Sequence, residues 1–159
     1  MEVSRRAMQE GFHFRAFGRD DLPELEQMVL ALYQEDPPGE EMSREKIRRT
    51  VEELTLRADK GVILLFWAGR AVVGYAIVIH YWSNEYGGNV EVIDELYVKP
   101  PWRGKGIGTA FLGHLCAAGE GGGTKGLALE VTPANQRALA YYRRQGLRPA
   151  KNRHLFKKL

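Results

Sequence analysis

The chain has 159 residues, of which 44% are hydrophobic and 27% charged, an ordinary balance for one globular domain. The formal net charge is only +3, and the basic residues are dispersed rather than gathered in a patch, which argues against a nucleic-acid partner. No apolar run approaches the roughly 20 residues that span a bilayer, and residues 1–11 lack the apolar segment of a signal peptide. We therefore expect a cytoplasmic protein with no membrane and no nucleic-acid partner.

The sequence gives little support for cysteine or metal chemistry. The single cysteine, Cys116, excludes an internal disulfide, and its place in an apolar helical pattern predicts a buried structural thiol. Neither CxxC pairs nor an HExxH spacing occurs. We therefore expect no metal site.

The first third of the chain predicts one strand and two helices. We expect a loose extension over residues 1–11 and a single domain over residues 12–159. Alternating apolar and polar side chains predict a first strand from Phe12 to Phe17. A helix with an apolar stripe follows and ends by Asp36, because the Pro-Pro-Gly run after it cannot continue a helix. A second helix is expected after Ser43, a residue suited to the N-cap.

The remaining elements alternate between strands and helices. Three β-rich runs cover residues 62–67, 71–81 and 90–98, and a helix follows with apolar positions at helical spacing. After a glycine-rich turn come a short strand, a helix and a last short strand at residues 155–159. The order β-α-α-β-β-β-α-β-α-β predicts an α/β (α+β) fold. We expect a mixed, mostly antiparallel central sheet of six to seven strands flanked by four helices.

The most informative stretch runs from Asp94 to Thr109. A strand ends at Val98, two prolines turn the chain, and three glycines open a helix. Glycines let the backbone approach a ligand closely, and the first N–H groups of a helix favour an anion such as pyrophosphate. Arg103 and Lys105 add positive charge. The spacing matches neither the dinucleotide fingerprint nor a Walker loop, and the alternative is a glycine-rich turn that binds nothing.

Two motifs in this order resemble the GNAT superfamily of N-acetyltransferases. The Arg-x-x-Gly-x-Gly sequence that begins at Arg103, directly after Leu-Tyr-Val, is similar to that family's acetyl-CoA signature. The Asn-x-x-Ala-x-x-Tyr-Tyr-x-x-x-Gly-Leu sequence from Asn135 to Leu147 is similar to the motif that follows the family's fifth strand. The expected element order also matches, so the resemblance covers residues 12–159.

The resemblance implies that acetyl-CoA is the acetyl-donor co-substrate. Backbone N–H groups of the glycine-rich loop would bind its pyrophosphate, and its pantetheine arm would lie along the end of the fourth strand. The residues expected to contact the coenzyme are Leu96, Tyr97, Val98, Arg103, Gly104, Lys105, Gly106, Ile107, Gly108, Thr109, Asn135, Ala138 and Tyr142. For Asn135 the alternative is a helix cap alone.

The resemblance also implies direct attack of a primary amine on the thioester. Tyr142 matches the tyrosine that protonates the departing thiolate in many members, and its alternative role is that of a core aromatic. Strand alternation places Asp94 on an apolar face with Val92 and Leu96, which favours Asp94 over Glu95 as the base. A bulge would exchange the two faces, and the proton could also pass through water.

The acceptor is less well defined than the donor. The resemblance implies a small-molecule or peptide amine acceptor and a homodimer. An acidic loop with Glu35, Asp36, Glu40 and Glu41 favours a cationic amine, such as a polyamine, an aminoglycoside or a lysine side chain, and the alternative is a solvated loop that contacts nothing. A second reading of the whole chain is a non-catalytic coenzyme A-binding regulatory module.

Overall fold

The computed structural model describes residues 11–151 and 155–158. Their centre is a five-stranded sheet in the order β1-β2-β3-β4-β5. The strands are β1 (Phe12–Ala16), β2 (Gly61–Ala68), β3 (Ala71–Ser83), β4 (Gly88–Val98) and β5 (Gly126–Leu129). The first four strands pair antiparallel and β5 pairs parallel to β4, so the sheet is mixed and mostly antiparallel, as predicted.

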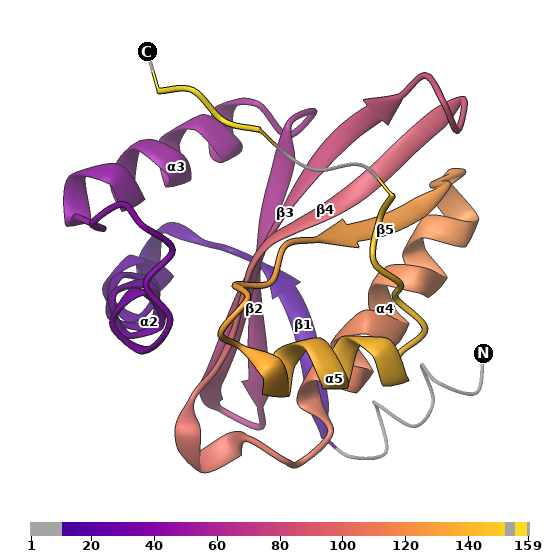
Figure 1. Cartoon of the computed structure of the whole chain (residues 1–159). Coiled ribbons are helices and arrows are strands. Elements are labelled where there is room, and N and C mark those ends of the chain that lie inside the picture. Colours follow the sequence, from indigo (N-terminus) through magenta and orange to yellow (C-terminus); the bar gives the residue numbers. More distant parts are fainter. Residues whose placement is uncertain (1–10, 152–154, 159) are drawn as a thin grey trace.

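Four α-helices flank this sheet, as the sequence also predicted (Figure 1). They are α2 (Leu22–Glu35), α3 (Arg44–Leu56), α4 (Ile107–Gly122) and α5 (Gln136–Arg144), with short 3-10 segments η1 (Arg19–Asp21) and η2 (Pro100–Trp102). The side chain of Ser43 caps α3 by accepting a hydrogen bond from the Lys46 N–H. Within the described residues, no helix is both long and apolar enough to cross a membrane.

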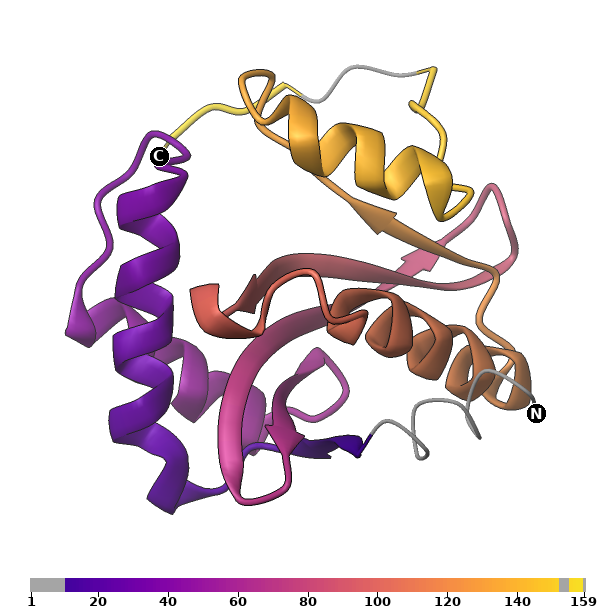
Figure 2. The same ribbon diagram turned by 90° about the horizontal axis from the view of Figure 1, so that it is seen from below.

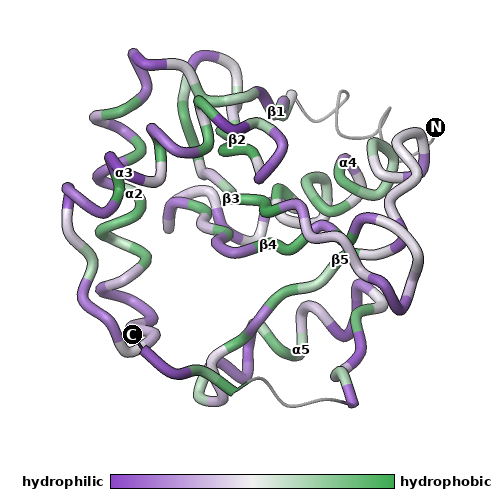
Figure 3. The backbone as a smooth tube through the Cα atoms, turned by 90° about the horizontal axis from the view of Figure 1, so that it is seen from above, coloured by the Kyte–Doolittle hydropathy of each residue, from purple (hydrophilic) through white to green (hydrophobic). Residues whose placement is uncertain are grey.

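The sheet separates two hydrophobic clusters. On one face, Phe66 and Val78 pack with Phe111 of α4, and on the other, Leu65 and Tyr75 pack with side chains of α2 and α3. Figure 3 shows hydrophobic residues running along the central strands and alternating with polar residues along the helices. The helical and strand periodicities in the sequence therefore correspond to two buried faces of one sheet.

The predicted last strand differs from the structure. Residues 155–158 form no strand, and residue 159 lies outside the described residues. Leu155 and Phe156 are 89% and 82% exposed, so this short segment lacks the apolar burial that stabilises an added strand. The sheet therefore has five strands among the described residues rather than six to seven. The extension expected over residues 1–11 lies outside the described part of the chain except for Gly11.

The prediction for Cys116 was wrong. The buried stripe of α4 runs through Ile107, Phe111 and Leu115, and Cys116 is exposed. Each helical residue is rotated by about 100° from the one before it, so the residue after Leu115 points away from the sheet. The apolar residues around Cys116 indicated a buried helix, but they did not show which face of the helix the cysteine occupies.

Candidate active site

A β-bulge in β4 decides how the two candidate carboxylates are placed. Ile77 of β3 pairs with Glu95, whereas the next residue, Val78, pairs with Ile93, so Asp94 is the extra residue. Asp94 is consequently exposed, and Glu95 points into the protein with 9% of its surface exposed. The face predicted for Asp94 from strict alternation was wrong, because a bulge shifts the alternation by one residue. The structure contains the bulge that would exchange the faces of Asp94 and Glu95.

The pairing between strands β4 and β5 ends directly before the bulge residue Asp94. Their pairing stops at Ile93 and Leu129, although β4 continues to Val98. Beyond that point β4 and β5 diverge, with α4 on the β4 side and α5 on the β5 side (Figure 2). The β4 edge over residues 94–98 thus faces no strand among the described residues. Apart from the Val98 carbonyl oxygen, which accepts from Arg103, its backbone groups on that side are available to a ligand.

The glycine-rich loop forms the start of α4. Gly104 and Gly106 have φ angles of 75° and 84°, a left-handed conformation that favours glycine, and Gly106 is the N-cap of α4. No side chain in the described part of the chain caps this helix end, which leaves its first N–H groups directed at the space in front of it. A Cβ atom on Gly108 would lie 2.9 Å from the hydroxyl oxygen of Tyr141, so a glycine there lets α5 approach α4.

The two basic residues of this loop are held by neighbouring groups. The Lys105 Nζ lies 4.6 Å from the centre of a Trp102 ring. The Arg103 Nη2 lies 2.7 Å from Glu35 Oε2, and its Nε donates a 2.7 Å hydrogen bond to the Val98 carbonyl oxygen. Arg103 therefore ties the loop to the end of α2 and to the end of β4, a link that the sequence pattern did not predict.

Asn135 occupies the start of α5, as its motif predicted. Its Oδ1 accepts a 3.0 Å hydrogen bond from the Ala138 N–H, which caps the helix. Its Nδ2 donates a 3.0 Å hydrogen bond to Asp36 Oδ2, and the Thr132 hydroxyl donates a 2.7 Å hydrogen bond to Asp36 Oδ1. Asp36 is 99 residues from Asn135, so no local signal in the sequence could have revealed this contact.

Tyr142 lies on α5 and packs against the hydrophobic cluster that includes α4. Burial is the main cause that raises its pKa to about 12, and the neighbouring Tyr141 adds to the effect. Among the described residues, the Tyr142 hydroxyl has no hydrogen-bond partner. The ring thus packs against the core, while the hydroxyl remains free to bind a ligand atom.

Partial desolvation by the surrounding protein raises the pKa of both carboxyl groups at the bulge. For Asp94 the second cause is the nearby charge of Glu130, which follows β5. For Glu95, a hydrogen bond from the Tyr75 hydroxyl and the nearby Tyr33 hydroxyl oppose the rise, whereas the charge of Asp94 adds to it. The Tyr75 hydroxyl donates at a distance of 2.7 Å. Two carboxyl groups with raised pKa values therefore lie where β4 and β5 separate, one exposed and one held by tyrosines.

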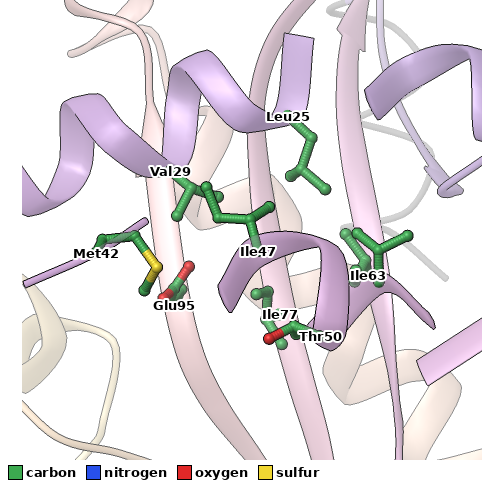
Figure 4. A pocket seen from close by; sticks show the side chains of 9 residues that line it. Leu25, Val29, Met42, Ile47, Thr50, Ile63, Ile77 and Glu95 are labelled. Carbon is green, nitrogen blue, oxygen red and sulfur yellow. The ribbon is translucent and has the colours of Figure 1, made fainter. Parts of the chain in front are cut away.

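The buried Glu95 borders a small pocket between the sheet and helices α2 and α3. Figure 4 shows its carboxylate beside Met42 and Val29, with Ile77 and Ile47 nearby. The wall around this carboxylate is largely apolar, which is the physical source of its raised pKa.

Most of the acidic loop after α2 is engaged within the protein. Two of its four carboxylates contact Arg103 and Asn135, as described above. Glu40 forms an ion pair with the Lys158 ammonium group, at 3.1 Å. The Glu41 backbone oxygen accepts a hydrogen bond from Lys46 of α3. The loop therefore contacts other parts of the chain, and a role in attracting a cationic acceptor stays a prediction.

Comparison with known proteins agrees with this geometry. The model of the acetyltransferase (GNAT) family matches residues 26–147, and the chain therefore belongs to that family, as its two motifs predicted. A possible acetyltransferase from Clostridium difficile has a similar structure, with a TM-score of 0.82 and 22% identity over 94% of this chain and 99% of that chain. Aminoglycoside N-acetyltransferase AAC(6')-Iy in complex with CoA gives a TM-score of 0.75 and 17% identity over 92% and 94%.

A curated relative adds a comparison at the sequence level. The chain is 33% identical over 92 residues to thialysine N-epsilon-acetyltransferase of Bos taurus. The match covers 56% of this chain and 54% of that protein, so the chain spans about half the length of this relative.

Proposed function

We propose that the chain is an N-acetyltransferase that moves the acetyl group of acetyl-CoA onto a primary amine. One observation carries the proposal: the open edge of β4 after Ile93 lies beside the uncapped start of α4 at Gly106. The first supplies backbone groups for an extended pantetheine arm, and the second supplies N–H donors for a pyrophosphate. A coenzyme that carries both groups fits this combination.

The donor site uses mainly backbone. The main-chain groups of Leu96 and the N–H of Val98 would bind the pantetheine arm, and the N–H groups of residues 104–109 would bind the pyrophosphate. The Val98 carbonyl oxygen and the Arg103 N–H already have partners in the chain, and the main-chain groups of Tyr97 point toward β3. Lys105 would add positive charge near these phosphates. Asn135 would shape the site through its cap on α5 and its contact with Asp36. No group of at least three His, Cys, Asp or Glu side chains in the described residues could hold a metal ion, and the proposed reaction does not need one.

The chemistry would be a direct transfer. The neutral amine attacks the thioester carbon, the C–N bond forms, and the C–S bond breaks with the electron pair leaving on sulfur. Asp94, which is exposed at the open edge of β4, would accept the amine proton directly or through water, and Glu95 is the second candidate. The Tyr142 hydroxyl would donate a hydrogen bond to the departing thiolate, which then takes up its proton through water.

For the acceptor we propose an amine that is cationic in solution. Asp94 is exposed at the open edge of β4, where its negative charge would attract a protonated amine before it loses its proton. The relative named for thialysine acts on an amine of this kind. Small cationic amines such as thialysine, lysine, polyamines and aminoglycosides are therefore the first acceptors to test.

Two measurements test the proposal. Acetyl-CoA should raise the melting temperature, because a ligand that binds only the folded state stabilises it. Release of CoA thiol should then be measured with each amine in the panel. A thermal shift without transfer to any amine would favour the non-catalytic coenzyme A-binding module, and the absence of both would overturn the assignment of the coenzyme site.

A further inference from the structure

Glu35, the last residue of α2, and Asp36, its C-cap, reach opposite sides of the proposed coenzyme site. Glu35 contacts Arg103 of the loop before α4, at 2.7 Å. Asp36 accepts hydrogen bonds from Thr132 and Asn135 in the segment between β5 and α5, at 2.7 and 3.0 Å. In Figure 2 the end of α2 lies on the side toward which β4 and β5 diverge. One helix end therefore connects the two segments that start α4 and α5.

This connection matters because α5 is weakly held by packing. None of its nine residues is buried, whereas six residues of α4 are buried. Tyr141 and Tyr142 pack against the core from outside it, and the N-terminus of α5 is attached through the side chain of Asn135 to Asp36. The direction of α5 thus depends on a polar contact at its start.

We propose that Asp36 is a positioning residue for the reaction, a role that deepens and rests on the proposed function. The neighbouring Glu35 contacts Arg103 in the loop that begins α4, and Asp36 itself holds the start of α5 through Asn135. Tyr142 lies seven residues after Asn135, which corresponds to about 10 Å along a helix. A tilt of about 6° at the cap therefore moves the Tyr142 hydroxyl by about 1 Å, and a displacement of that size can cost about 100-fold in rate.

The test is an exchange of the two hydrogen-bonding side chains. Asp36→Asn keeps the size of the side chain but leaves one acceptor oxygen for the two donors Thr132 and Asn135. One of the two hydrogen bonds is lost, so kcat should fall at least tenfold, with the Kd for CoA within about twofold of wild type. Asn135→Asp alone should also lower kcat, because it places two carboxylates together. The double variant Asp36→Asn/Asn135→Asp restores a donor and an acceptor, retains a good N-cap, and should recover most of kcat.

The matched control is Glu45→Gln, a change at an exposed carboxylate of α3 that pairs with Arg49. It should leave kcat and CoA affinity unchanged. If Asp36→Asn unfolds the chain, Thr132→Val provides a milder change that removes one of the two hydrogen bonds, and kcat should fall severalfold with CoA affinity kept.

The outcomes separate the inference from the function on which it rests. A wild-type chain that neither binds acetyl-CoA nor releases thiol contradicts the proposed function. A wild-type chain that turns over while Asp36→Asn and Thr132→Val keep full kcat contradicts the role of Asp36 alone. Loss of kcat in the single variants without recovery in the double variant also overturns it, because the effect would not come from this pair.

Discussion

Replacing Tyr142 with phenylalanine removes one hydroxyl and keeps the ring that packs against the core. The pKa of about 12 limits what that hydroxyl can do. A thiol has an ordinary pKa near 8.5, so full proton transfer to a thiolate of that kind is unfavourable by about 5 kcal/mol. A hydrogen bond to the developing negative charge is worth about 1.5–3 kcal/mol. We therefore expect kcat to fall by about 10- to 200-fold.

The assay is the rate of thiol release from acetyl-CoA at saturating amine, together with the Kd of CoA from calorimetry. The affinity for CoA should stay within about twofold, because the hydroxyl acts when the thiolate leaves rather than in the ground state. The tyrosine should add no limb to the pH profile below about pH 11, because its raised pKa keeps it protonated there.

The matched control is Tyr141→Phe, which removes the adjacent hydroxyl on the same helix. That hydroxyl lies 3.4 Å from the Thr109 side chain at the start of α4, so its loss should affect the binding of acetyl-CoA more than kcat. Wild-type kcat in Tyr142→Phe, with wild-type stability, would refute the assignment and leave Tyr142 as a core aromatic.

Three further predictions concern the loop, the base and the fold. Gly106→Val should abolish the thermal shift by acetyl-CoA, because φ is 84° there and a branched side chain is strained in that conformation, whereas Gly121→Ala, which faces open space, should keep the shift. Asp94→Asn should lower kcat and remove the acidic limb of the pH–rate profile. A base acts in its deprotonated form, so wild-type activity is lost as the pH falls through the raised pKa of Asp94. A pH–rate profile that changes only in Glu95→Gln would assign the base to Glu95. Ser43→Ala removes the cap of α3 and should cost about 0.5–2 kcal/mol of unfolding free energy, measured by denaturant titration, with no change in CoA affinity.

The sequence by itself determined the features that depend on neighbouring residues. Alternation and helical spacing located the strands and helices, and the Pro-Pro-Gly run after Asp36 and the cap at Ser43 bounded two helices. The glycines around Gly106 predicted the turn into α4, since few other residues adopt its positive φ. Two motifs at a fixed separation were enough to indicate the family.

Only the tertiary structure decided the features that depend on pairing between distant segments. The bulge at Asp94 arises from the register of β4 against β3, and it exchanges which carboxylate is buried. The contacts of Asp36 with Asn135 and of Glu35 with Arg103 join residues 99 and 68 positions apart. Such contacts form because the sheet brings α2, α4 and α5 to one end of β4, and no local periodicity in the sequence records that arrangement.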